Sequence, residues 1–107
     1  MTQSRVVLAH AGPELLGMAQ VAADGAGGDG ELCKLFVDPA QMGRGVGAAL
    51  FGWAVAELRR AGAARMRIEA DPDAVPFYRH MGARLVGQAP SGSVPGRMLP
   101  LLSLPLG

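Results

Sequence analysis

The chain has 107 residues, half of them hydrophobic and 18% charged, with a net charge of +1. This is the composition of one globular domain spanning residues 1–107. The small net charge excludes the strong field of a nucleic-acid-binding protein, and no apolar run is long enough to cross a bilayer, so we expect neither nucleic-acid nor membrane partners. The polar N-terminus lacks the layout of a signal peptide, and a single cysteine permits no internal disulfide; both favour a cytoplasmic location.

Three strands are predicted in the first third of the chain. Arg5–Ala11 is a short apolar run ended by a Gly-Pro pair, and Leu15–Ala23 forms a second strand that pairs with it as a hairpin. Asp24–Gly30 is rich in glycine and predicts a flexible turn. Glu31–Val37 then forms the third strand.

A long helix and a fourth strand follow. Apolar residues recur every four positions from Val46 to Leu58, which predicts a helix over Val46–Ala61 that Gly62 ends. Ala64–Ala70 alternates between apolar and polar residues and is predicted to be a strand.

The last third of the chain predicts a short helix and two strands. Asp73 is expected to cap a helix over Ala74–Met81. Arg84–Gln88 and Arg97–Leu104 are expected to be the closing strands, joined by the turn-rich Ala89–Gly96.

The predicted element order is β-β-β-α-β-α-β-β, which is a mixed α/β fold around one sheet. The strand–helix–strand unit between residues 31 and 70 needs a right-handed parallel crossover. The remaining strands can pair antiparallel.

The most specific motif is QMGRGVGA, between the third strand and the long helix. Gly43, Gly45 and Gly47 let the backbone approach a ligand closely. The helix start directs unpaired N–H groups and its positive dipole end toward that ligand, so we expect a pyrophosphate there. Arg44 either adds a charge-assisted contact or points to water.

Other phosphate-binding loops fit this motif less well. A Walker loop needs Gly-Lys-Ser/Thr, which is absent. Gly43, Gly45 and Ala48 fit a nucleotide fingerprint, with Glu69 about twenty residues on, but Asp38–Met42 intervenes between strand and loop. A glycine-rich turn without a ligand is the remaining alternative.

Two segments of the chain resemble the signatures of the GCN5-related N-acetyltransferases. Leu35–Pro39 (LFVDP) followed by Met42–Ala48 (MGRGVGA) resembles the family's coenzyme A signature. Asp71–Gly82 (DPDAVPFYRHMG) resembles its second signature, a short helix carrying Phe-Tyr and ending in Gly. The resemblance covers about residues 15 to 104 and implies an acyl-CoA N-acyltransferase fold, with a mostly antiparallel sheet and one splayed parallel strand pair.

The resemblance also implies where acetyl-CoA would bind. Where the parallel strands part, unpaired main-chain amides are expected to bind the pantetheine arm through Leu35, Phe36 and Val37. The loop residues implied to hold the pyrophosphate are Met42, Gly43, Arg44, Gly45, Val46, Gly47 and Ala48. The family usually has Arg or Gln at Met42, so we expect weaker cofactor binding here. It usually has Asn at Asp71, whose carboxylate places a negative charge near the cofactor cleft, and we assign no consequence to that charge.

Acetyl transfer to an amine requires a base for the amine and an acid for the departing thiolate. The resemblance implies that Tyr78, which follows Phe77 in the second signature, is the acid. It also implies that Glu31, which opens the pantetheine-binding strand, is the base. A backbone N–H near Phe36–Val37 is the expected oxyanion donor. The alternatives are that Tyr78 only packs its ring on the sheet and that Glu31 is only solvated.

Three further residues have chemistry that the sequence assigns to no site. Cys33 has no neighbouring His partner and is predicted to be a small buried strand residue rather than a nucleophile. His10 and His80 lack metal-ligand spacing, so no metal is expected and both are interpreted as structural or solvated. His10 is also a candidate for the wall of an acceptor pocket.

The predicted function is acetyl-CoA-dependent transfer of an acetyl group to a primary amine, by direct attack in a ternary complex. The alternative is a non-catalytic coenzyme A-binding module, or a subunit needing a partner chain. The family normally begins with a strand and two helices that wall the acceptor site, and this chain starts near the second strand. The site is therefore expected to be open or completed by a homodimer partner.

The sequence leaves the acceptor open between small-molecule and peptide amines. The segment from Pro90 to Arg97 is expected to border the acceptor side, because it joins the last two strands. Its Ser91, Ser93 and Arg97 either supply selectivity or belong to a rigid turn.

Overall fold

A computed structural model of the chain describes residues 3–23, 27–92 and 94–107. Its elements, in chain order, are β1 (Gln3–Ala11), β2 (Glu14–Ala23), β3 (Asp29–Val37), the 3-10 turn η1 (Pro39–Gln41), α1 (Val46–Arg60), β4 (Arg65–Glu69), the 3-10 turn η2 (Pro72–Ala74), α2 (Val75–His80), β5 (Arg84–Pro90) and β6 (Met98–Pro105). The predicted order of strands and helices is confirmed. Within the described residues, no helix is long and apolar enough to span a bilayer.

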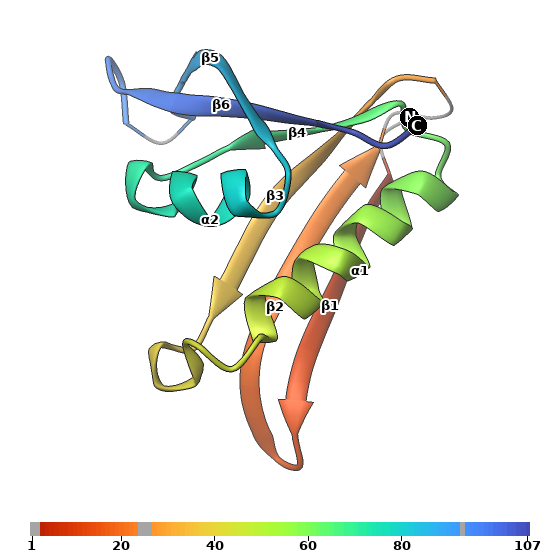
Figure 1. The fold of residues 1–107 in the computed structure, drawn as a ribbon, viewed down its shortest axis with the longest axis vertical. Helices are drawn as coiled ribbons and strands as arrows, with labels where there is room; N and C mark the ends of the chain where they lie inside the picture. Colours follow the sequence, from red (N-terminus) through yellow and green to blue (C-terminus); the bar gives the residue numbers. More distant parts are fainter. Residues whose placement is uncertain (1–2, 24–26, 93) are drawn as a thin grey trace.

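The six strands form one sheet in the order β1-β2-β3-β4-β6-β5 (Figure 1). β3 and β4 are parallel, as predicted, and the other neighbouring pairs are antiparallel. Both helices pack on the same face of the sheet, because Phe51 of α1 meets Phe77 of α2 with ring centroids 6.2 Å apart. The opposite face carries no helix of the described chain.

The core lies between the helices and the sheet. Phe51, Ala54 and Leu58 of α1 are buried against residues from β2, β3, β4 and β6. The four-residue periodicity of α1 is therefore confirmed from Leu50 to Leu58. Val46, the first residue of the pattern, is only half-buried, since it lies where the helix leaves the preceding loop.

Two glycines lie where neighbouring elements approach closely: Gly17 beside the backbone of β3 and Gly30 beneath α1. A Cβ on Gly17 of β2 would lie 2.4 Å from the carbonyl oxygen of Phe36, and a Cβ on Gly30 of β3 would lie 2.7 Å from Leu58 Cδ2. Both distances are too short for real contacts, so these positions admit no side chain unless neighbouring atoms move.

Several predicted bounds differ from the structure. β3 begins at Asp29, inside the predicted turn, of which residues 24–26 lie outside the described chain. The prediction that Asp73 caps the second helix is wrong. The N-cap of α2 is Ala74, which provides no capping side chain. Asp71 caps the preceding turn η2: its carboxylate accepts a hydrogen bond from the Asp73 N–H at 3.0 Å, and its extended backbone before Pro72 suits that position.

Candidate functional site

The parallel strands β3 and β4 separate part of the way along the sheet. They pair from Asp29↔Arg65 to Leu32↔Ile68 and no further. Beyond Leu32, β3 continues to Val37 beside β2 alone, and Figure 1 shows it running away from β4. The backbone groups of this segment that face away from β2 have no ladder partner among the described residues, so the predicted splay is confirmed.

A β-bulge lies where the strands separate. Leu32 pairs with Val21 and Lys34 pairs with Gln20, so Cys33 is an extra residue on β3. A bulge bends its strand and increases the local twist. The bulge at Cys33 therefore gives a physical reason for the departure of β3 from β4 at this point.

The bulge also reverses which residues of β3 face the helices. Gly30 and Leu32 are buried before it, whereas Leu35 and Val37 are the partly buried residues after it. Phe36 consequently points to the open face, where it is 51% exposed. Of the predicted pantetheine-binding residues, two thus face the helix side and one faces the open side.

The prediction that Cys33 is buried is wrong, because its position in the bulge exposes it. Partial desolvation, with the nearby Glu31 carboxylate, raises the pKa of the Cys33 thiol. Its Sγ lies 3.9 Å from the Glu31 carbonyl oxygen. A thiol held protonated is a poor nucleophile, in agreement with the non-nucleophilic interpretation.

The loop between β3 and α1 is fixed at its first turn. The Asp38 carboxylate accepts a hydrogen bond from the Ala40 N–H at 2.9 Å. Gln41 is buried, and its side-chain amide donates to Glu14 Oε1 at 3.2 Å. Sequence reasoning missed the Gln41–Glu14 contact, because it joins residues 27 positions apart.

The glycines of the loop adopt the conformations that require glycine. Gly43 has φ 81° and Gly45 has φ 79°, both left-handed. Gly45 is the N-cap of α1 and provides no side chain to cap it. Met42 is 68% exposed and Arg44 is also exposed, so neither side chain covers the loop.

The start of α1 presents bare amides. The first helical hydrogen bond runs from the Ala49 N–H to the Gly45 carbonyl at 3.0 Å. The N–H groups of Val46, Gly47 and Ala48 have no backbone partner among the described residues. The first turn contains no acidic residue. The arrangement therefore suits an anion such as a pyrophosphate.

The short helix α2 approaches this loop through Phe77. A Cβ on Gly47 would lie 3.5 Å from the Phe77 ring and 3.5 Å from the Val37 side chain. The Phe77 ring thus lies beside both the end of β3 and the start of α1. The second signature segment, residues 71–82, therefore lies next to the glycine loop of the first signature.

Tyr78 is buried, with 8% of its surface exposed, and it packs among aromatic rings. Its ring centroid lies 5.3 Å from that of Phe77 and 6.0 Å from that of Phe51. Burial raises the pKa of the Tyr78 phenol, so the group keeps its proton at neutral pH. Its hydroxyl has no hydrogen-bond partner in the part of the chain that the structure describes. The ring packing that we expected as an alternative is present, and the acid role stays a prediction.

Glu31 lies on the face of the sheet opposite the helices, because its neighbours Gly30 and Leu32 face α1. It is half-buried and lies next to Arg67 in the parallel register. Arg67 pairs with Glu69 at 3.1 Å instead, and within the described ranges Glu31 has no ion-pair partner. Its carboxylate is thus available at the point where the strands separate.

The segment between β5 and β6 is tied back to η2. Arg97 lies 4.0 Å from the Asp71 carboxylate, and its carbonyl accepts a hydrogen bond from the Ser91 N–H at 2.8 Å. Ser93 lies outside the described residues.

His10 and His80 are both exposed, and no cluster of potential metal ligands occurs among the residues with described positions.

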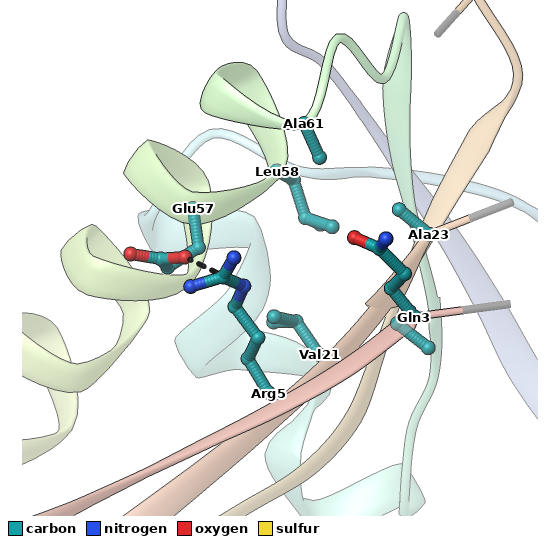
Figure 2. Close-up of a pocket in the computed structure, with 8 residues that line it drawn as sticks. Gln3, Arg5, Val21, Ala23, Glu57, Leu58 and Ala61 are labelled. Carbon is teal, nitrogen blue, oxygen red and sulfur yellow. Dashed lines mark ion pairs between the residues drawn. The ribbon is translucent and has the colours of Figure 1, made fainter. Parts of the chain in front are cut away.

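A shallow pocket lies at the opposite end of α1 from the glycine loop (Figure 2). An ion pair between Arg5 and Glu57, 3.6 Å apart, crosses it. Its lining residues are Gln3, Arg5, Val21, Ala22, Ala23, Glu57, Leu58 and Ala61. It contains none of the predicted site residues.

Residues 1–90 match the sequence profile of the acetyltransferase (GNAT) domain. No curated protein matches the chain in sequence.

Solved structures with the same fold include a nourseothricin acetyltransferase, which is 27% identical with a TM-score of 0.85 over 97% of this chain and 66% of its own. An aminoglycoside 6'-N-acetyltransferase complexed with coenzyme A is 15% identical, with a TM-score of 0.82 over 97% of this chain and 73% of its own. A GNAT acetyltransferase from Elizabethkingia anophelis with acetyl-CoA bound is 14% identical, with a TM-score of 0.83 over 95% of this chain and 76% of its own. The chain thus spans about two thirds to three quarters of the length of these proteins.

Proposed function

The chain belongs to the GNAT acetyltransferase family, and we propose on that basis that it transfers the acetyl group of acetyl-CoA to a primary amine. The observation that carries the proposal is the separation of β3 from β4 beyond Leu32 and Ile68, which leaves main-chain groups of β3 unpaired. An unpaired backbone group costs about 1–3 kcal/mol when buried. The amides of a pantetheine arm are matched hydrogen-bond partners for such groups, and the bare start of α1 supports a pyrophosphate beside it.

The residues proposed for catalysis lie on the two faces of the sheet. Glu31 lies on the open face and Tyr78 on the helix-covered face. We propose that the thioester lies where β3 and β4 separate, with Glu31 on one side of it and Tyr78 on the other. In the proposed ternary complex, the Glu31 carboxylate takes a proton from the amine, whose nitrogen bonds to the acetyl carbon. The carbon–sulfur bond breaks, and the Tyr78 hydroxyl gives its proton to the departing thiolate.

The protonation state of the Tyr78 phenol supports its assignment as the acid. A base must remain available while the acid stays protonated. Because burial raises the pKa of the phenol, Tyr78 holds its proton throughout the neutral range. The pKa of a thiol is ordinarily below that of a phenol. The two values come closer when the thiolate is shielded from water, because burial also raises the pKa of the thiol.

The test is a combined binding and turnover experiment. Calorimetry measures acetyl-CoA binding, and release of free thiol is followed with a panel of small-molecule and peptide amines. The protein carries Cys33→Ser, because the exposed cysteine would otherwise react with the thiol reagent. We expect Tyr78→Phe to keep acetyl-CoA affinity and to lower kcat by roughly 10²–10⁴-fold.

Glu31→Gln tests the base. We expect it to lower kcat near neutral pH and to recover activity as the pH rises and more of the amine is neutral. Asp29→Asn, an exposed carboxylate of the same strand that pairs with Arg65 at 2.8 Å, is the matched control and should leave kcat unchanged. Tight binding of acetyl-CoA without turnover on any amine would favour a coenzyme A-binding module. Absence of binding would overturn both functions.

We place this reaction in the cytoplasm. The exposed, unpaired Cys33 suits a reducing compartment.

A further inference from the structure

A buried side chain ties the glycine loop to the sheet. Gln41, the last residue of η1, is the one polar residue that is buried among the described positions. Its amide donates to Glu14 Oε1 at 3.2 Å. Within the described chain, no other side-chain hydrogen bond joins residues 38–48 to another element. A buried amide without a partner is costly, so the Glu14 carboxylate stabilises Gln41 in this place.

A backbone contact anchors the same stretch to the same strand. The Asp38 N–H donates to the Leu16 carbonyl at 2.8 Å, and Glu14 is the first residue of β2. The start of β2 therefore holds η1 at both of its ends, through the main chain at Asp38 and through the side chain at Gln41. A substitution at Glu14 removes the second anchor and leaves the first in place.

A tight turn connects Gln41 to the start of α1. Met42 has φ −60° and ψ 142°, and Gly43 has φ 81°, which match a type II turn with glycine at its third position. The Arg44 N–H donates to the Gln41 carbonyl at 3.4 Å, which closes the turn. Gly45, the next residue, is the N-cap of α1. The position of Gln41 therefore sets the position of the bare amides that follow.

Beyond this anchor, little else fixes the loop. Met42 and Arg44 are exposed. A Cβ on Gly43 or on Gly45 would meet nothing within 4 Å, so no neighbouring element packs on the turn at these positions. A glycine-rich segment that loses its anchor gains many backbone conformations. Binding of an anion would then have to order the segment again, which lowers the affinity.

We propose that Glu14 is a positioning residue for the diphosphate of coenzyme A. It acts through Gln41, which holds the turn so that the bare amides of α1 are preorganised for the anion. Glu14 does not touch the diphosphate, since two negative groups in contact would repel each other. The inference rests on the proposed function, because the diphosphate belongs to acetyl-CoA.

The test compares acetyl-CoA dissociation constants, measured by calorimetry. Glu14→Ala removes the acceptor of the Gln41 amide, and we expect the constant to rise roughly tenfold. Glu14→Gln keeps an acceptor oxygen and should stay within about threefold of the unaltered protein. Gln41→Leu fills the buried position without an amide and should match Glu14→Ala. Combining Glu14→Ala with Gln41→Leu should add no further loss, because both remove one contact.

Kinetics separate positioning from general damage to the fold. Glu14→Ala should raise the KM of acetyl-CoA while kcat and the KM of the amine stay unchanged, because the effect is confined to the diphosphate. Inhibition by inorganic pyrophosphate, which competes for the same amides, should weaken by the same factor as acetyl-CoA binding.

Gln20→Leu is the matched control. It removes a glutamine amide of the same strand, which donates to Ser4 Oγ at 2.8 Å. It should leave the acetyl-CoA dissociation constant unchanged. Glu14 is exposed, so circular dichroism should show that Glu14→Ala and Glu14→Gln keep the fold.

Several results would overturn the inference and leave the proposed function standing. They are equal acetyl-CoA constants for Glu14→Ala and the unaltered protein, tighter binding by Glu14→Ala, and additive losses in the double variant. A loss that also lowers kcat, and that Gln20→Leu reproduces, would show a general effect on stability instead. If the unaltered protein binds neither acetyl-CoA nor pyrophosphate, the proposed function and this inference are both overturned.

Discussion

Tyr78 is the only tyrosine of the chain, so its ionisation can be followed without interference from another phenol. Its ring packs against Phe51 and Phe77. Burial disfavours the charged phenolate and raises the pKa. The packing interpretation and the acid interpretation therefore describe one arrangement, in which the rings hold the phenol in its neutral form.

We predict that ultraviolet titration of the native protein gives a Tyr78 midpoint above about 10, the ordinary value of a phenol. In denaturant the midpoint should return to about 10. Phe51→Leu should lower the native midpoint, because it admits water beside the ring. Phe36→Leu, which changes an exposed phenylalanine on the other face, should not. A native midpoint at or below that of the denatured chain would contradict the burial of Tyr78.

The same shift predicts the dependence of stability on alkaline pH. The folded pKa is raised, so the neutral phenol contributes stability that is fully present below the unfolded pKa, about 10. That contribution is lost as the pH rises through the folded pKa. Urea unfolding should therefore show a decline above pH 10 that Tyr78→Phe reduces, and an identical decline in both proteins would refute the linkage.

The glycine loop provides a test at the level of an element. Gly45 has φ 79°, whereas Gly47 lies inside α1 with room for a Cβ at 3.5 Å from its neighbours. We predict that Gly45→Ala lowers the free energy of unfolding by roughly 1–2 kcal/mol, because an L-residue is strained there. Gly47→Ala should not lower it. Equal stabilities of the two variants in urea unfolding would contradict the left-handed N-cap.

The close approach of β2 to β3 can be tested in the same way. A Cβ on Gly17 would meet the Phe36 carbonyl oxygen at 2.4 Å, whereas one on Gly52 of α1 would meet nothing within 4 Å. We predict that Gly17→Ala lowers the free energy of unfolding by about 3 kcal/mol. Gly52→Ala should raise it by up to about 1 kcal/mol, through helix propensity. A well-tolerated Gly17→Ala would contradict the close approach of the strands.

The sequence predicted the elements whose signals are local. The periodicity from Leu50 to Leu58 and the glycines before α1 act within a few residues, so the helix and its loop could be located. The bulge at Cys33 could not be predicted. One extra residue shifts which side chains of a strand face each side of the sheet, and the local composition gives no signal of it. The Gln41–Glu14 contact depends on the folded sheet. Asp71 and Asp73 are both residue types that cap helices, and only the folded backbone shows that Asp71 caps η2 and that α2 has no capping side chain.

At the scale of the whole molecule, the sheet consists of two halves joined by a short parallel ladder. One half holds β1, β2 and β3 with α1, and the other holds β4, β5 and β6 with α2 (Figure 1). The halves are joined by the pairs from Asp29↔Arg65 to Leu32↔Ile68 and by the rings of Phe51, Phe77 and Tyr78. The proposed acetyl-CoA site lies where the two halves separate, so bound acetyl-CoA would contact both of them.

The most direct test of this account follows the backbone amides by nuclear magnetic resonance as acetyl-CoA is added. We predict that the shifts concentrate in two segments, 33–37 of β3 and 43–48 at the start of α1, with smaller changes at Tyr78. Shifts confined to the pocket beside Glu57, or no shifts at saturating acetyl-CoA, would contradict the claim that the separated strands form the cofactor site.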